Sequence, residues 1–233
     1  MKPAFILMLT YNDQTVKNAL EIFREHKDTP VKHWGFKDVG LPVNEMKQLV
    51  GEMKQADKTT YLEVVSLSEA EGLAGAKLAV EAGFDILMGT VFFDSILDYL
   101  RDKPIKYYPF PGHVYSHPSI LDGTMDEIVQ HARFLEGRGV QGMDLLSYRY
   151  VGDAPALLRA VVAATKVPIV SAGSIESEKR LAEVRDAGTW GFTIGSALFD
   201  KKFAPEGSFR DNILAVCDWL EKNGESTPVK SGS

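Results

Sequence analysis

The chain has 233 residues, of which 45% are hydrophobic and 25% charged, and its formal net charge is −6. This length is typical of a single barrel domain. Because the net charge is negative and would repel the phosphates of a nucleic acid, we expect no nucleic-acid partner. A single cysteine, Cys217, excludes a disulfide framework and a thiolate metal cluster within one chain. The apolar run at 5–9 is too short for a membrane span and lacks a signal-peptide layout, which predicts a cytoplasmic protein without membrane contact.

Short apolar or β-branched runs alternate with segments of helical periodicity along the whole chain, a pattern typical of parallel strands joined by crossover helices. We predict strands at 4–9, 32–36, 60–65, 85–88, 106–110, 142–146, 168–171 and 191–194. We predict helices at 13–26, 43–56, 68–82, 92–100, 124–136, 154–165, 177–187 and 209–222. Eight such units favour an α/β fold, a single-domain (β/α)₈ TIM barrel over 1–224, followed by a polar tail at 225–233. An open doubly wound sheet is the alternative fold.

Polar residues after the first three strands are candidates for a site, because barrel sites lie on the loops that follow the strands. Thr10 and Asn12 follow the first strand, and we expect them to bind substrate. Lys37 and Asp38 follow the second strand. Burial would lower the pKa of Lys37 and make it a base or a Schiff-base nucleophile. Asp38 would adjust or oppose this pKa shift and contact substrate. Glu63 interrupts an apolar run on the next strand, which is costly unless a cation such as Lys37 lies beside it. We predict that Lys37 and Glu63 form an acid–base pair. The alternatives are a surface lysine beside a helix start and a purely structural buried ion pair.

Two later segments add candidate catalytic residues. The loop at 109–123 is the longest that follows a strand, and it contains His113 and His117, so it is a candidate lid. His113 lies closest to the strand end and is a candidate proton donor, with loop packing as the alternative. Asp144 in the sixth strand is a third interior carboxylate, and Arg149 beyond it would meet substrate hydroxyls or a carboxylate at the rim.

Two turns of small residues follow the seventh and eighth strands, Ser-Ala-Gly-Ser-Ile at 171–175 and Ile-Gly-Ser-Ala-Leu at 194–198. Glycine lets a phosphate approach the backbone, serine hydroxyls add donors, and a helix N-terminus presents positive partial charge. The pair resembles the phosphate motif of the ribulose-phosphate-binding barrel superfamily, in which N-acetylmannosamine-6-phosphate epimerases and indole-glycerol-phosphate synthases carry similar turns. The resemblance implies phosphate ligands, mainly backbone amides, at Gly173, Ser174, Gly195 and Ser196. Simple packing of two tight turns is the alternative.

A second resemblance covers the whole chain. The run Gly-Phe-Lys-Asp-Val-Gly-Leu-Pro at 35–42 is similar to one carried by an uncharacterised bacterial group of barrels, some of which bear the label 4-hydroxythreonine-4-phosphate dehydrogenase. The sequence does not favour that activity, because no G-x-G-x-x-G follows a strand and the histidines lack the spacing of a metal triad. The Asp-x-Lys-x-x-Asp signature of orotidine-phosphate and ketogulonate-phosphate decarboxylases is also missing from the third strand, which disfavours decarboxylation by that mechanism.

Together these residues favour an isomerase, an epimerase or an aldol-type lyase that acts on a small phosphorylated sugar or hydroxy-carbonyl compound. We expect no organic cofactor; a single Mg²⁺ held by carboxylates stays open, although no ligand cluster demands one. The rival is a phosphate-binding barrel without turnover that senses a metabolite, as the glycerol-3-phosphate-responsive antiterminators do with a related barrel. Those proteins bind RNA, which the acidity of this chain disfavours. The carbon skeleton of the substrate and a homo-oligomeric state stay open.

Overall fold

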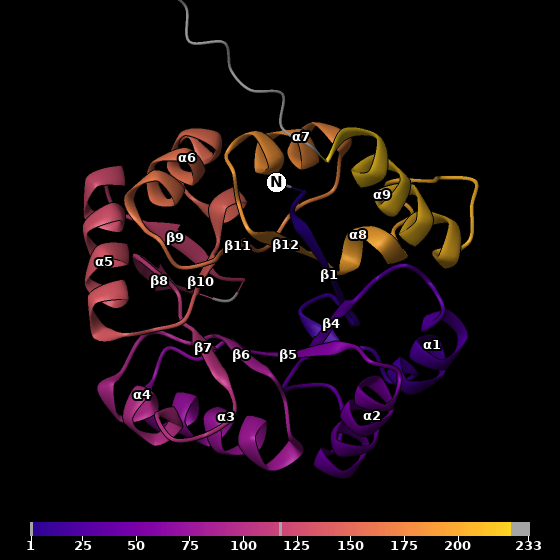
Figure 1. Ribbon diagram of the computed structural model, residues 1–233, viewed down its shortest axis with the longest axis horizontal. Helices are drawn as coiled ribbons and strands as arrows, with labels where there is room; N and C mark the ends of the chain where they lie inside the picture. The colour runs from indigo at the N-terminus through magenta and orange to yellow at the C-terminus, as the bar shows by residue number, and fades with distance from the viewer. Residues whose placement is uncertain (1, 117, 225–233) are drawn as a thin grey trace, which may run out of the picture.

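The computed structural model of the chain describes residues 2–116 and 118–224, and the predicted tail at 225–233 lies outside them. Within these residues, eight parallel strands form one sheet that curls into a ring (Figure 1). They are β1 (Ala4–Met8), β4 (His33–Lys37), β5 (Thr59–Val64), β6 (Ile86–Gly89), β7 (Lys106–Tyr108), β10 (Met143–Leu145), β11 (Ile169–Ser171) and β12 (Gly191–Ile194). The predicted (β/α)₈ barrel is confirmed, and each strand lies within two residues of its predicted bounds.

The ring runs in the order β10, β11, β12, β1, β4, β5, β6 and β7, with every neighbouring pair parallel. Backbone hydrogen bonds then join β7 to β10. The amide of Gln141 donates to the carbonyl of Tyr107 (3.2 Å), and the amide of Asp144 donates to the carbonyl of Pro109 (3.1 Å). The sheet therefore surrounds a lumen that side chains fill.

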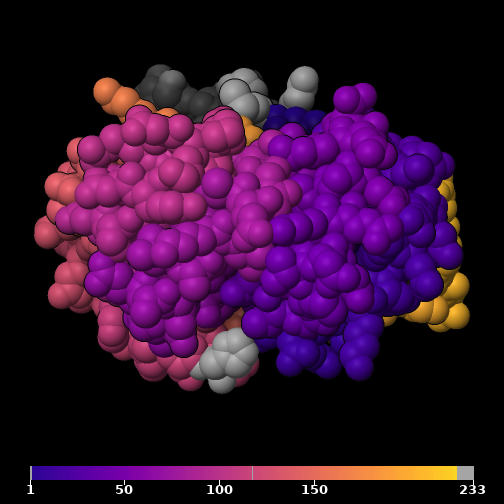
Figure 2. All heavy atoms as spheres, turned by 90° about the horizontal axis from the view of Figure 1, so that it is seen from below, coloured from indigo at the N-terminus to yellow at the C-terminus, as the bar shows by residue number. Residues whose placement is uncertain are grey.

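Helices cover the outside of the ring (Figure 1). They are α1 (Ala19–His26), α2 (Val43–Gln55), α3 (Glu69–Ala82), α4 (Asp94–Leu100), α5 (Met125–Arg138), α6 (Ala154–Ala164), α7 (Glu178–Asp186) and α9 (Phe209–Asn223). Two short turns of helix, η1 (Ser147–Arg149) and α8 (Ser196–Phe199), follow β10 and β12. In the side view of Figure 2, the first half of the chain forms a continuous outer wall. No helix in the described residues is long and apolar enough to cross a bilayer.

Local signals explain where several helices start and stop. The side chain of Ser68 accepts a hydrogen bond from the amide of Glu71, and Thr124 forms a capping box with Glu127, as their sequences predict. Gly83 ends α3 with a φ of 83°, a conformation that glycine adopts without strain. These starts and stops fix the loop lengths at the barrel ends.

Two segments differ from the prediction. The first helix starts at Ala19 instead of residue 13, because Asn12 and Asp13 have φ values of 48° and 62°. These two residues make the turn of a hairpin between β2 (Thr10–Tyr11) and β3 (Gln14–Thr15). The loop at 109–123 likewise contains a hairpin, formed by β8 (His113–Tyr115) and β9 (Ile120–Asp122). Both hairpins follow strand ends, at the face of the barrel where sites occur.

The lumen contains an apolar cluster and a charged cluster. Alternate residues of a strand point to the same side of the sheet. The inner face therefore carries Gly35 and Lys37 on β4, Tyr61 and Glu63 on β5, and Gly142 followed by Asp144 at β10. The apolar cluster consists of Ile6, Met8, Tyr61, Ile86, Met88, Tyr108 and Val170. The charged cluster consists of Lys37, Glu63 and Asp144. The glycines make room for the rings: a Cβ on Gly35 would lie 3.0 Å from that of Tyr61, and one on Gly142 would lie 2.5 Å from the Tyr108 ring.

Candidate functional site

A cavity of about 200 Å³ opens where the strands end, at the face that carries the sites of such barrels. Predicted residues from both ends of the chain line it: Thr10, Lys37, Glu63, Arg149, Gly173, Ser174, Gly195 and Ser196. The fold therefore brings the two small-residue turns and the Lys37–Glu63 pair into one cavity. Asn12, Asp38, Asp144 and His113 are not part of this lining.

Lys37 lies at the centre of the charges in the cavity and is only 7% exposed. Its Nζ donates a hydrogen bond to Asp13 Oδ1 at 2.8 Å and lies 3.9 Å from Glu63 Oε1. Burial acts to lower the pKa of Lys37, but the charge of Glu63 and the hydrogen bond to Asp13 outweigh it and raise the pKa above its ordinary value. The expectation of a lowered pKa is therefore wrong, and Lys37 is a cation at neutral pH.

Asp13 lines the cavity, although the sequence predicts that it starts a helix. The hairpin turn aims its carboxylate at Lys37, and Arg149 Nη2 lies 3.5 Å from the same oxygen. The side chain of Thr15 fastens the hairpin to β4 by donating to the carbonyl of Lys37 (2.8 Å) and accepting from its amide (2.9 Å). A signal existed, because Asn-Asp between short β-prone runs favours a two-residue hairpin turn over a helix start.

Glu63 and Asp144 differ in their access to the cavity. Glu63 lines it, with 9% of its surface exposed, and among the described residues no donor makes a hydrogen bond to its carboxylate. Asp144 is fully buried beneath, and no described residue makes a hydrogen bond to either of its carboxylate oxygens. Burial, reinforced by the charge of Glu63, raises the pKa of Asp144 well above its ordinary value; Lys37 and the nearby amide of Gly89 oppose the shift only in part.

Two other predicted residues lie around the cavity. Asp38 is half-buried at the end of β4, where burial raises its pKa to about 6, and its amide donates to the carbonyl of Glu63 (3.3 Å). The amide of Asn12 donates to Ser196 Oγ (3.2 Å), which ties the first hairpin to α8.

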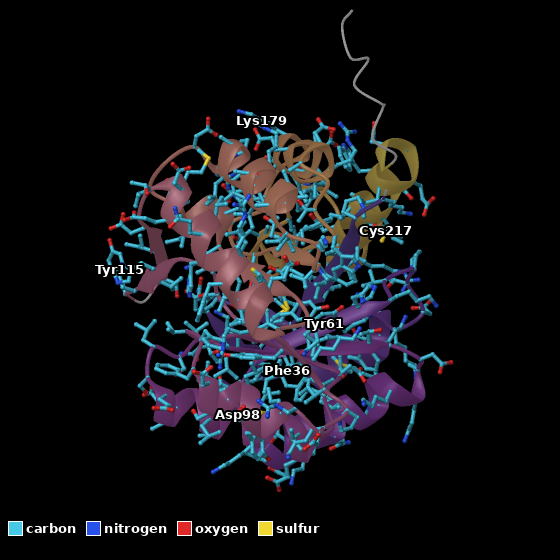
Figure 3. The ribbon with its side chains drawn as sticks, turned by 60° about the vertical axis from the view of Figure 1, so that its left-hand side comes forward. Phe36, Tyr61, Asp98, Tyr115, Lys179 and Cys217 are labelled. Atoms are coloured by element: carbon cyan, nitrogen blue, oxygen red, sulfur yellow. The ribbon has the colours of Figure 1, made fainter. Side chains whose placement is uncertain are left out.

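The β8–β9 hairpin keeps His113 away from the cavity. His113 is exposed, and its ring stacks on Tyr115 with centroids 5.4 Å apart. Tyr115 lies at the outer edge of the molecule (Figure 3), so the structure does not bring His113 to Lys37 and Glu63. The same hairpin instead contributes Ser119, a lining residue that no sequence pattern indicated, and His117 lies outside the described residues.

The turn at 171–175 exposes backbone amides to the cavity. Gly173 and Ser174 have φ values of 79° and 58°, and among the described residues no acceptor takes a hydrogen bond from their amides. A Cβ at Gly173 would lie 2.9 Å from Arg149 Nε, so the guanidinium packs directly on the glycine. Backbone donors beside an arginine suit an anion such as a phosphate.

The turn after β12 has a similar construction. A Cβ at Gly195 would lie 2.4 Å from Thr10 Oγ1, so a side chain does not fit there, and Ser196 begins α8 with amides that a helix start leaves unpaired. Two carboxylates, Glu176 and Asp200, also line this part of the cavity. Arg180 Nη1 lies 3.3 Å from Glu176, and the hydroxyl of Tyr11 donates to Asp200 at 3.2 Å.

Within residues 2–116 and 118–224, no three His, Cys, Asp or Glu side chains are grouped so that they could hold a metal ion. Two of the cavity carboxylates pair with cations instead: Asp13 lies beside both Lys37 and Arg149, and Glu63 lies beside Lys37. The expectation that no cofactor is needed stays a prediction.

No protein-family model matches the sequence, and no curated protein matches it significantly. Solved structures are similar in fold. Orotidine 5'-phosphate decarboxylase from Pyrococcus horikoshii OT3 matches with a TM-score of 0.68 at 14% identity, over 93% of this chain and 99% of that one. The tryptophan synthase alpha chain from Legionella pneumophila matches at 0.65 and 13%, over 97% and 94%. N-acetylmannosamine-6-phosphate 2-epimerase from Clostridium perfringens matches at 0.63 and 12%, over 87% and 92%. The predicted resemblance to ribulose-phosphate-binding barrels is confirmed for the fold.

Proposed function

We propose that this chain is an enzyme that moves a proton within a small phosphorylated hydroxy-carbonyl compound, as an isomerase or an epimerase does. One observation carries the proposal: a single cavity is lined by the two amide-rich turns and by the Lys37–Glu63 pair. A phosphate and the carbon that reacts are then held by different walls of the same cavity. Its volume of about 200 Å³ lies below the range of about 300–1,000 Å³ for drug-sized ligands, which favours a compact metabolite.

The phosphate of the substrate would bind at the turns. The amides of Gly173 and Ser174 and those at the start of α8, from Ser196 on, supply donors, and the Arg149 guanidinium supplies positive charge. Binding energy from this remote group holds the carbonyl end against Lys37 and Glu63. Thr10 closes the back of the Gly195 turn.

The charges around Lys37 support carbon-acid chemistry. Glu63 would remove a proton from the carbon beside the carbonyl, and the electron pair of that C–H bond would move to the carbonyl oxygen to give an enediolate. The Lys37 ammonium would donate a hydrogen bond to this oxygen as its negative charge grows. Return of the proton from Glu63 to the former carbonyl carbon gives an isomer, provided that the hydroxyl proton of the enediolate passes to the other oxygen. Return to the other face of the same carbon requires a second donor.

The cationic state of Lys37 favours reactions through an enolate over reactions through a Schiff base. A Schiff base forms only from a neutral amine, and the two carboxylates beside Lys37 favour its charged form. An isomerase, an epimerase or a lyase that works through an enolate is therefore favoured over an imine-forming aldolase.

The proposal is tested by proton exchange with deuterated water. Triose, tetrose and pentose phosphates that contain a carbonyl group are incubated with the protein, and deuterium uptake at carbon is followed by NMR. We expect uptake from at least one compound, and a decrease of about 10²- to 10⁴-fold in Lys37→Met, because a general acid–base group is lost. Lys58→Met is the matched control: Lys58 is also 7% exposed, but its Nζ donates to the carbonyl of Val31 (2.7 Å), outside the cavity.

Two outcomes would contradict this function. If a phosphorylated compound binds in competition with inorganic phosphate but shows neither exchange nor cleavage, the chain acts as a metabolite sensor instead. If borohydride traps an adduct on Lys37 in the presence of the compound, the chemistry proceeds through an imine and not through a charged lysine.

A further inference from the structure

Asp144 is an anomaly of the barrel lumen. Its carboxyl group is completely buried, and within the described residues neither oxygen has a hydrogen-bond partner. Polar groups at such depth are normally hydrogen-bonded, and an ionised carboxylate without a partner is strongly disfavoured. The rest of the residue is well ordered by the sheet, since its amide donates to the carbonyl of Pro109 and β10 pairs with β11. The carboxyl group therefore calls for an explanation that packing does not give.

The groups that face Asp144 come from each element around it. Glu63 on β5 brings negative charge, while Lys37 on β4 and Arg149 on η1 bring positive charge from beyond hydrogen-bond distance. The amide of Gly89 on β6 lies near, and the register partner on β11 is the apolar Val170. Neither cation is committed to Asp144, because both lie within 3.5 Å of Asp13.

We propose that Asp144 and Glu63 hold one proton between them and that it sits on Asp144, which makes Asp144 a positioning residue that keeps Glu63 ionised toward the cavity. The inference rests on the proposed function, in which Glu63 is the base. The asymmetry of the two groups decides where the proton sits. Glu63 faces the cavity with Lys37 Nζ 3.9 Å away, whereas Asp144 has neither solvent nor a hydrogen-bonded cation.

This arrangement serves the proposed reaction in two ways. A neutral Asp144 adds no second negative charge beneath Glu63, so the enediolate oxygen meets the Lys37 ammonium without repulsion from a second carboxylate. The burial of the Asp144 carboxyl group without a hydrogen bond from any described residue also makes it unfavourable for Glu63 to pass its charge to Asp144, which confines the base to the side that substrate reaches. Asp144 itself does not line the cavity and therefore acts through Glu63.

The experiment is a carboxyl titration that needs no substrate. The protein is labelled with ¹³C at the aspartate side-chain carboxyls, and NMR spectra are recorded from pH 5 to pH 9 for wild type, Asp144→Asn and Glu63→Gln. We expect one aspartate signal of a neutral acid at pH 7 that is missing in Asp144→Asn. In Glu63→Gln its titration midpoint should fall by about one pH unit or more, because interacting carboxyls titrate as a pair. Asp38→Asn, which removes an acid from the other side of Glu63, is the control and should move the midpoint less.

The result that would overturn the inference is an ionised Asp144 at pH 7, or a midpoint that is the same in Glu63→Gln and wild type. If Asp144→Asn does not fold, the signal is assigned through bonds in the wild type and the comparison with Glu63→Gln still decides. The shift of the Asp144 midpoint in Glu63→Gln is a readout that a merely structural role for Asp144 would not move. Failure of the exchange experiment above would remove the proposed function but leave these titrations interpretable.

Discussion

The apolar cluster and the charged cluster of the lumen meet on β5, where Tyr61 and Glu63 are two residues apart, and they differ in what they contribute to the protein. On β5, Tyr61 is fully buried and its hydroxyl lies 2.9 Å from His33 Nδ1. Glu63 faces the cavity, and no residue in the described part of the chain makes a hydrogen bond to its carboxylate. On β4, Gly35 leaves room for Met8 Sδ and for the Cβ of Tyr61, while Lys37 is held by two carboxylates. The comparison shows that residues that stabilise the fold and residues suited to chemistry lie at different levels of the barrel. Tightly packed side chains fill one level, and charged side chains with few hydrogen bonds occupy the next.

Burial of the charged cluster lowers the stability of the folded protein. Buried ion pairs rarely repay the desolvation of their charges, and within the described residues neither carboxylate oxygen of Asp144 has a hydrogen-bond partner. The apolar cluster and the packing of the outer strand faces against the helices supply the stability that offsets this cost. Experiments that change one cluster at a time are the way to test this division.

The largest effect is expected in the apolar cluster. Tyr61→Ala leaves a cavity in the lumen and a His33 ring without its hydrogen-bond partner, which should cost about 3–5 kcal/mol in the free energy of unfolding. Urea denaturation measures it. Tyr115→Ala, at the outer edge (Figure 3), is the matched control and should cost less than about 1 kcal/mol. Equal losses in the two variants would contradict the division between clusters.

Next in size is the pH dependence from Asp38, which follows Lys37 at the edge of the charged cluster. Because the pKa of Asp38 is raised to about 6, its stabilising contribution is fully present below the unfolded pKa of about 3.9 and is lost as the pH rises through 6. Asp38→Asn escapes this loss, so at pH 8 it should be more stable than wild type by up to about 3 kcal/mol, with the gain vanishing at pH 4.

The control for this titration has the opposite sign. Hydrogen bonds from Thr60 and Lys54 outweigh the effect of burial and lower the pKa of Asp85, so Asp85→Asn should be less stable than wild type at pH 8. Denaturation curves at pH 4, 6 and 8 measure both variants. A gain of Asp38→Asn that does not change with pH would rule out burial of its charge as the cause.

The smallest effect concerns the phosphate turns. Gly173→Ala places a methyl group against Arg149 and beside the exposed amides, so phosphate should bind about tenfold more weakly, equivalent to about 1.4 kcal/mol. Gly83→Ala has a similar φ, 83° against 79°, but its new Cβ would meet nothing within 4 Å. Titration calorimetry with inorganic phosphate compares the two, and equal affinities would place the anion elsewhere.

Much of the fold could be predicted from the sequence because strands, helices and turns are indicated by short stretches of residues. The eight strands lie where short apolar runs predicted them, since strand alternation and helix periodicity are properties of a few successive residues. The turns at 171–175 and 194–198 were found for the same reason. The helix expected from residue 13 failed because Asn12 and Asp13 favour a hairpin turn, a competing local signal.

The sequence by itself determined the barrel, the face on which a site would lie, and the residue types available there. Only the tertiary structure decided the partners, because they come from segments far apart in the chain: Asp13 meets Lys37 across 24 residues and Arg149 across 136. It also reversed the expected pKa shift of Lys37, because the shift depends on how many carboxylates the fold places beside the ammonium and not on burial alone. The same holds for Asp144, whose burial without a hydrogen-bond partner in the described chain depends on where β4, β5, β6 and β11 place their side chains.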